Sequence, residues 1–309
     1  MGTVCISVDA ELGWGFFDTA EPPMGRLNRA VWGWNQLREL CDRYGIPTTW
    51  AVVGHLCLDD CDGVHREHPL GAERFERERT EWSTRQSLRF GPSLVDDVLS
   101  ADVDHELASH SFSHPDFTVE STTDAVVRAE LSQFEAVTDD YGVDATSFVF
   151  PRNHIAHREL LVDRGYRCYR DLSPTRQLEP LARRQLEKLR QTTIGSPPLV
   201  RPRIDDHGLV AIPASLYLFG FEGCGRNVAE LVGTDPIVRQ AIGGIERVAA
   251  TDRLFHMWLH PNNVTTLADV DRLEAIWQHL AAAREAGRVD VMTMGEIARD
   301  ELAAEPQYA

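Results

Sequence analysis

The stretch that decides the fold lies near the amino terminus and reads "CISVDAELGWG", from Cys5 to Gly15. Its apolar beginning predicts a buried β-strand, and the strand ends on two carboxylates, Asp9 and Glu11. Because side chains alternate along a strand, both carboxylates are expected to point to the same side. Such a pair is explained equally well by a functional site and by one acid that caps a helix or turn beside one solvated acid.

Outward from this strand, apolar strand-like runs alternate with amphipathic helical runs. Further strands are expected near residues 46–56, 105–112, 145–151, 166–171, 209–218, 253–261 and 289–294, and long helices near 27–45, 123–142 and 267–287. This alternation predicts parallel strands joined by helical crossovers, which is an α/β fold. We expect a single distorted β/α barrel of about seven strands. A doubly wound open sheet is less favoured, because no glycine-rich phosphate-binding motif follows the first strand.

The chain shows no internal boundary that would divide it into domains. Residues 1–300 are expected to form the barrel, with irregular insertions near 59–88 and 172–203 and a tail over 301–309. The second insertion contains a predicted basic helix over 181–191.

Composition excludes several classes of partner. The 309 residues carry a net charge of -17, which repels phosphate backbones and argues against nucleic-acid binding. No apolar run is long enough to span a membrane, and no basic leader precedes the first strand, so a cytoplasmic location is expected. Six cysteines in a chain of this length are not typical of a disulfide framework.

The segment "HSFSH" places His110 and His114 four residues apart after the strand near 105–112. On a helical turn this spacing puts both imidazoles on one face, where they can chelate one ion. Two histidines together with a carboxylate from another segment are typical of a catalytic metal site. Two hydrogen-bonded histidines in an ordinary loop are the simpler alternative.

Two further candidates follow other strands. His260 ends the run "LFHMWLH" and can serve as a general acid. Arg152 follows "SFVFP" and either pairs with Asp9, holding it ionised, or is an ordinary surface arginine.

A second group of metal-binding residue types surrounds the start of the first insertion. Cys57 and Cys61 have His55, His65 and His68 nearby. A second zinc site is one interpretation, but the spacings match no common zinc pattern. A cysteine- and histidine-bearing loop is the favoured interpretation.

Taken together, "ISVDAE", "IPTTWAVVG", "HELASHSFSH" and "RLFHMWLHP" resemble motifs of the polysaccharide deacetylase family, also called carbohydrate esterase family 4 or the NodB-homology proteins. The resemblance covers most of the chain and implies a distorted β/α barrel and a divalent-metal deacetylase, often with zinc. It implies that Asp9 is the catalytic base, His260 the general acid, and His110 and His114 the metal histidines.

The chain departs from the family pattern at two places. The family's metal carboxylate directly follows the base, where this chain has Ala10, so Glu11 becomes the candidate third ligand. The family's third motif has an arginine before a proline, whereas here Arg152 follows Pro151.

The resemblance and the residues together predict a metal-dependent hydrolase that removes an acetyl group from an N-acetylated sugar of a glycan or glycan precursor. The absence of a leader favours a nucleotide- or lipid-linked precursor. A metal-dependent amidohydrolase acting on a small cyclic amide, and a non-catalytic carbohydrate-binding relative, are the alternatives.

Overall fold

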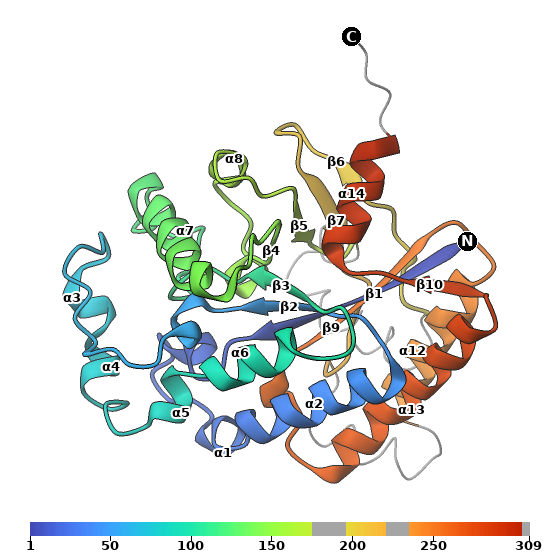
Figure 1. Cartoon of the computed structure of the whole chain (residues 1–309), viewed down its shortest axis with the longest axis horizontal. Helices are drawn as coiled ribbons and strands as arrows, with labels where there is room; N and C mark the ends of the chain where they lie inside the picture. The colour runs from blue at the N-terminus through green and yellow to red at the C-terminus, as the bar shows by residue number, and fades with distance from the viewer. Residues whose placement is uncertain (175–195, 221–234, 305–309) are drawn as a thin grey trace, which may run out of the picture.

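The central strand of the molecule is the one that the opening stretch predicts. In the computed structural model, which describes residues 1–174, 196–220 and 235–304, β1 (Gly2–Ala10) runs through the middle of the sheet (Figure 1). It pairs in parallel with strands that come from three distant parts of the chain. Burial on both faces explains why its sequence is a nearly continuous apolar run.

The sheet has ten strands within the described residues, and all neighbours are parallel except one pair. Besides β1 they are β2 (Thr49–Val52), β3 (Glu106–Ser109), β4 (Ser147–Phe148), β5 (Cys168–Asp171), β6 (Arg203–Ile204), β7 (Val210–Pro213), β8 (Leu216–Tyr217), β9 (Leu254–Leu259) and β10 (Val289–Val291). Their order is β6-β7-β5-β4-β3-β2-β1-β9-β8, with β10 beside β1 and β6 antiparallel to β7.

The sheet curls because one segment of chain borders both of its ends. The backbone N–H of Ala214, just after β7, donates to the carbonyl of Asp171 in β5 with an N–O distance of 3.0 Å. The next residue, Ser215, donates instead to the carbonyl of His256 in β9 at 2.8 Å. This change of partner splits the strand expected over 209–218 into β7 and β8. The predicted α/β fold with a distorted β/α barrel is confirmed, with more and shorter strands than the expected seven.

Helices cover the outside of the sheet (Figure 1). The longer ones are α2 (Ala30–Tyr44), α6 (Pro92–Leu99), α7 (Asp124–Thr138), α12 (Pro236–Val248), α13 (Leu267–Glu285) and α14 (Met294–Ala304), and the short ones are α1 (Met24–Leu27), α3 (Gly71–Arg74), α4 (Glu76–Arg79), α5 (Gln86–Arg89) and α8 (Arg158–Val162). Helices α2, α13 and α12 lie side by side along one flank. No helix among the described residues is both long and apolar enough to cross a membrane.

The packing of α2 shows how its sequence determines its position. Its buried residues recur at helical spacing, and Trp34 stacks on Trp50 of β2 with ring centroids 5.3 Å apart. The helix ends at Gly45, whose φ of 60° is the left-handed conformation that glycine adopts most readily.

The first predicted insertion, residues 59–88, carries α3, α4 and the beginning of α5. In the second, residues 175–195 lie outside the described residues, and so does the predicted basic helix over 181–191. Helix α14 extends to Ala304, so the first four residues of the expected tail are helical.

Candidate metal centre and active site

The predicted site residues come together at the ends of β1, β3 and β9; β9 is adjacent to β1, and β2 lies between β1 and β3. Asp9 and Glu11 stand at the end of β1, His110 follows β3, and His260 follows β9. The carboxyl ends of parallel strands meet at one edge of a barrel, which is where such folds gather their functional side chains. The structure therefore brings residues 9, 11, 110, 114 and 260 into one cluster.

Glu11, His110 and His114 form the inner part of this cluster. The Glu11 Oε2 atom lies 3.6 Å from His110 Nε2 and 3.3 Å from His114 Nε2. One donor atom from each residue lies within 4.8 Å of the others, and all three side chains are buried. Two imidazoles and one carboxylate around a common point match the ligand set of a catalytic zinc site.

The orientation of His110 fits a metal ligand. Its Nδ1 atom lies 2.7 Å from the carbonyl oxygen of Val149, which accepts a hydrogen bond from the ring. Nε2 then carries the lone pair, and this buried nitrogen has no hydrogen-bond partner among the described residues. Orientation of a ligating imidazole by a backbone carbonyl is common in metal sites.

His110 and His114 do not share a helical turn, contrary to the spacing argument. β3 ends at Ser109, and both Ser111 and His114 adopt left-handed φ angles of 62° and 57°. The Ser111 hydroxyl accepts a hydrogen bond from the His114 backbone N–H at 3.0 Å. This tight turn brings the two ring centroids to 4.8 Å. Left-handed residues other than glycine are costly and are concentrated at functional sites.

The glycine that ends the opening stretch makes room for Glu11. A Cβ atom at Gly15 would lie 2.1 Å from both Cδ and Oε1 of Glu11. The amide of Asn262 also donates to Glu11 Oε1 at 3.3 Å. The Glu11 carboxylate therefore lies between the backbone of Gly15 and the side-chain amide of Asn262, and it faces the two histidines.

Asp9 is held by an arginine that the sequence argument did not select. Arg170 of β5 donates to both carboxylate oxygens of Asp9, at 2.5 and 2.6 Å, and both side chains are buried. Arg170 also donates to Asn153 Oδ1 at 2.9 and 3.1 Å, and its guanidinium lies 4.4 Å from the centre of the Trp258 ring. A bidentate arginine–carboxylate pair fixes the position of the carboxylate and stabilises its ionised form.

The expected pairing of Arg152 with Asp9 is not formed. Arg152 instead forms an ion pair with Asp18, and both side chains are more than one third exposed. The reason is local: Arg152 lies in a left-handed turn with a φ of 59°, which directs the following residue, Asn153, toward Arg170. The rule that polar residues at strand ends gather in one site applies to Arg170 as well, because it stands at the end of β5.

His260 stands at the mouth of the cluster. Its Nε2 atom lies 3.6 Å from Asp9 Oδ2 and 3.7 Å from Glu11 Oε1. Its side chain is 20% exposed, whereas those of the other cluster residues are 6% exposed or less. The Tyr217 hydroxyl lies 3.3 Å from His260 Nδ1 and donates to Asn263 Oδ1 at 2.7 Å. His260 is thus positioned by the protein on one side and open on the other.

The electrostatic environment keeps both acids ionised. Burial raises the pKa of Asp9, but the charge and hydrogen bonds of Arg170 outweigh it and leave this pKa below its ordinary value. Burial also raises the pKa of Glu11, and the neighbouring histidines, His260 first, hold it well below its ordinary value. Burial lowers the pKa of His114, which favours the neutral imidazole that a metal requires.

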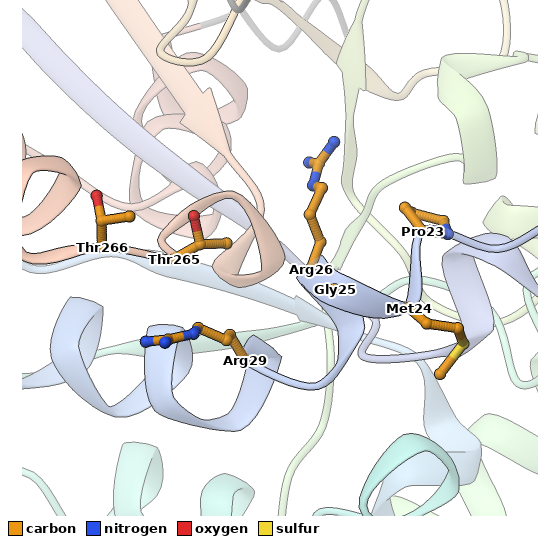
Figure 2. A pocket seen from close by; sticks show the side chains of 7 residues that line it. All are labelled: Pro23, Met24, Gly25, Arg26, Arg29, Thr265 and Thr266. Atoms are coloured by element: carbon orange, nitrogen blue, oxygen red, sulfur yellow. The ribbon is translucent and has the colours of Figure 1, made fainter.

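A hollow beside the cluster lies between α1 and the turn before α13, with Thr265 and Thr266 on its wall (Figure 2). Arg26 lines it and donates to Asn262 Oδ1 at 3.1 Å. Asn262 in turn donates to Glu11, so the hollow is connected to Glu11 by hydrogen bonds.

Comparison with solved structures shows a fold of the polysaccharide deacetylase type. A protein from Pseudomonas aeruginosa PAO1 assigned as a polysaccharide deacetylase superimposes with a TM-score of 0.61 at 14% identity, covering 98% of this chain and 92% of that chain. One from Mycobacterium smegmatis with the same assignment gives 0.59 at 16% identity, with 97% and 90% covered. No family model matches the sequence, and no curated protein does.

The same fold also carries another chemistry. The PuuE allantoinase structure superimposes with a TM-score of 0.60 at 13% identity, covering 98% of this chain and 91% of that chain. At these identities the comparisons establish the architecture, and the activity has to be argued from the site itself.

Proposed function

We propose that the protein is a metal-dependent hydrolase that removes an acetyl group from an N-acetylated sugar of a glycan or glycan precursor. One observation carries the proposal: a buried Glu11, His110 and His114 triad lies beside an arginine-held Asp9 and a partly exposed His260. A metal-ligand set, a base and an acid within one cluster are the parts that amide hydrolysis needs.

The metal would be held by Glu11, His110 and His114, and zinc suits two imidazoles and one carboxylate. The unpartnered, buried Nε2 of His110 supports this assignment. When bound, the ion supplies Lewis acidity, which polarises the substrate carbonyl and lowers the pKa of water. The two histidines and Glu11 are buried at the base of the cluster, so the substrate approaches from the side of His260.

Asp9 acts as the base in this proposal. It accepts a proton from the water whose oxygen attacks the acetyl carbon. Arg170 occupies one lone-pair direction on each Asp9 oxygen, and the remaining lone pairs are free to accept that proton. Arg170 and Asn153 act as positioning residues: Arg170 holds Asp9 directly, and Asn153 accepts hydrogen bonds from Arg170.

His260 acts as the acid. It donates a proton to the nitrogen of the sugar as the carbon–nitrogen bond breaks, which releases acetate and a free amine. The Tyr217 hydroxyl contacts the ring at Nδ1, and Asn263 Oδ1 accepts a hydrogen bond from the His260 backbone N–H, which together leave Nε2 near Asp9 and Glu11. Arg152, which was expected to assist Asp9, lies at the rim with Asp18, and we assign it no part in the chemistry.

The test combines metal content with acetate release from N-acetylglucosamine oligomers and precursors. The variant His110→Ala is expected to lose acetate release and about one metal ion per chain relative to the control. His154→Ala is the matched control, because His154 is half exposed and pairs with Asp116 outside the cluster. Retention of bound metal and of acetate release in His110→Ala, at the level of the control, would overturn the proposal.

A second candidate follows from the equal structural likeness to an allantoinase. In that case the same residues would open a small cyclic amide. Assays with cyclic ureides in parallel with acetylated sugars separate the two activities by their product. A protein that binds acetylated sugar but holds no metal and turns over neither class would instead be a non-catalytic relative.

A further inference from the structure

A second cluster of metal-binding side chains lies in the first insertion, apart from the candidate active site. It consists of His55, Cys61, His65 and Glu78, whose ligand atoms all lie within 4.8 Å of one another. His55 belongs to the barrel, in the short 3-10 helix Gly54–Cys57 after β2, and the other three belong to the insertion. The cluster therefore joins the insertion to the barrel.

His55 has the environment of a metal ligand. Its side chain is fully buried, and its Nδ1 atom lies 3.3 Å from the carbonyl oxygen of Arg89, which can only accept a hydrogen bond. Nε2 then presents a lone pair, 3.0 Å from Glu78 Oε1. This contact lacks hydrogen-bond geometry, and Nε2 has no hydrogen-bond partner in the described part of the chain. In a buried position, a nitrogen lone pair that faces a carboxylate oxygen is unfavourable unless a cation lies between the two atoms.

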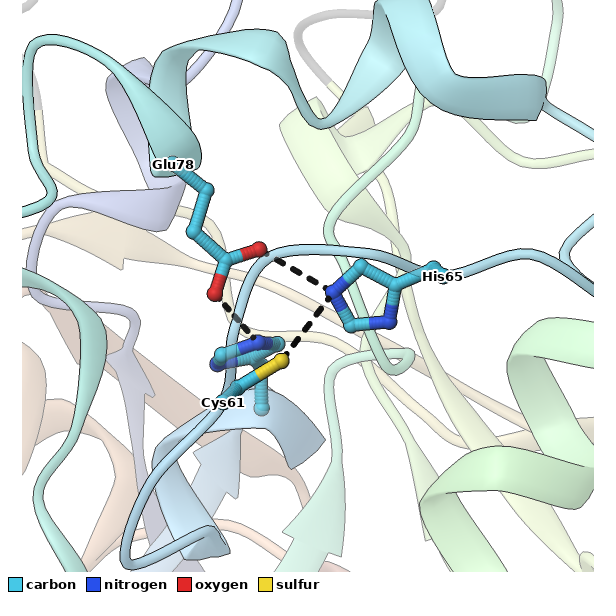
Figure 3. A group of neighbouring side chains, drawn as sticks. Cys61, His65 and Glu78 are labelled. Carbon is cyan, nitrogen blue, oxygen red and sulfur yellow. Dashed lines mark hydrogen bonds and ion pairs between the residues drawn. The ribbon is translucent and has the colours of Figure 1, made fainter.

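The ring of His65 contacts both Glu78 and Cys61 through one nitrogen. Its Nε2 atom lies 3.0 Å from Glu78 Oε2 and 3.6 Å from Cys61 Sγ, and Figure 3 shows both groups directed at this nitrogen. A single N–H could serve both groups only through a weaker, bifurcated hydrogen bond. Tetrahedral zinc with bonds of about 2.0–2.3 Å has ligand–ligand distances of about 3.3–3.7 Å. The Sγ–Nε2 distance of 3.6 Å falls in this range, and the two N–O distances of 3.0 Å lie just below it.

The surroundings support a closed site. The Gly63 backbone N–H donates to Cys61 Sγ at 3.3 Å, which stabilises a thiolate. Arg89 donates to Glu78 Oε1 at 2.6 Å and to the Cys61 carbonyl at 2.6 Å, an outer contact of the kind that orients ligating carboxylates. Aromatic rings enclose the group: that of Phe75 lies 4.1 Å from the His65 ring.

We propose that His55, Cys61, His65 and Glu78 bind a structural zinc ion that fastens the insertion to the barrel. A thiolate and imidazoles select zinc over magnesium or calcium, and four protein ligands leave no open position for substrate.

The insertion in turn supports the candidate active site. Arg74 donates to the carbonyl of Ser113 at 2.8 Å, beside His114. Arg77 donates to the carbonyls of Phe17 and Thr19 at 2.7 and 2.6 Å, in the loop that follows Glu11. Removal of the structural ion is thus expected to loosen loops that lie next to the catalytic residues.

Cobalt substitution provides the test, since only this cluster contains a thiolate among the candidate metal-binding groups of the described residues. The cobalt-loaded protein is expected to show thiolate-to-cobalt charge-transfer absorption in the near ultraviolet. Cys61→Ser should abolish this absorption and lower the zinc content by about one ion per chain. Cys57→Ser is the control, because Cys57 lies in the same segment outside the cluster, and His110→Ala should keep the absorption.

A measurement on the unaltered chain covers the case in which Cys61→Ser folds poorly. Cys61 is partly exposed, so a thiol reagent should modify it in chelator-treated protein, and added zinc should protect it. Two results would overturn the proposal: a cobalt spectrum without charge-transfer absorption, and modification of Cys61 at the same rate with and without zinc. Either result would show that the four residues form a hydrogen-bonded cluster that binds no zinc.

Discussion

Replacing Arg170 by methionine tests whether this arginine, rather than Arg152, holds the candidate base. Arg170 is 1% exposed and makes both of its short contacts with a carboxylate, Asp9, that is 2% exposed. Methionine keeps most of the packing against the Trp258 ring but removes the charge. The variant leaves an uncompensated charge in the interior, which typically costs about 3–5 kcal/mol.

The assay is thermal unfolding followed by circular dichroism. An unfolding entropy of about 2.1 cal/mol/K per residue gives about 0.65 kcal/mol/K for a chain of this length, so Tm is expected to fall by about 5–8 °C. Adding Asp9→Asn to the variant removes the unpaired charge. The double variant should therefore lose about 1–3 kcal/mol less than the sum of the single changes.

Arg152→Met is the matched control, because it removes the same kind of side chain from a pair that is largely solvated. Exposed pairs contribute about 0–1 kcal/mol, so Tm should fall by less than about 2 °C. Equal losses in the two methionine variants, or strict additivity of Arg170→Met and Asp9→Asn, would refute the assignment of Arg170 as the partner of Asp9.

Three further changes test other contacts of the site. Gly15→Ala should displace Glu11 and weaken zinc binding at least tenfold in a metal titration, whereas Gly243→Ala, where nothing lies near the new Cβ atom, should not. Burial lowers the pKa of His256 to about 3, against about 6.5 when unfolded, so its contribution to stability is lost as pH falls below 6.5. Between pH 6.5 and 4.5, urea unfolding should show the wild type losing about 2–3 kcal/mol more than His256→Gln, and equal losses would contradict the buried neutral state. Tyr217→Phe should lower kcat several-fold with little change in KM, because it removes one contact that orients the proposed acid; an unchanged kcat would remove that role.

Much of the architecture could be predicted because it depends on local patterns. Apolar runs that end in polar residues identified β1, β3 and β9, and the same patterns gave Asp9, His110 and His260. These residues stand at or directly after the ends of β1, β3 and β9, and only β2 separates two of these strands in the sheet. A rule about strand ends is therefore sufficient to bring them together.

Arg170 could not be assigned to Asp9 in this way, because three strands separate β5 from β1 in the sheet. At a spacing of about 4.8 Å per strand, a flat sheet would hold the two about 19 Å apart. Their 2.5 Å contact exists only because the sheet curls across the barrel. Curvature is a property of the whole sheet, and no short stretch of sequence encodes it.

The roles of the two acids follow from the alanine between them. Ala10 is fully buried in the large apolar cluster with Val4, Ile6 and Val8, on the face of β1 opposite the site. A carboxylate at that position would be directed into the core at a high desolvation cost. The strand's alternation thus leaves positions 9 and 11 to face the cluster, and the longer side chain of Glu11 reaches the histidines over the bare backbone of Gly15. Asp9, two residues earlier, reaches Arg170 instead, so the same strand supplies the proposed metal ligand and the proposed base with different partners.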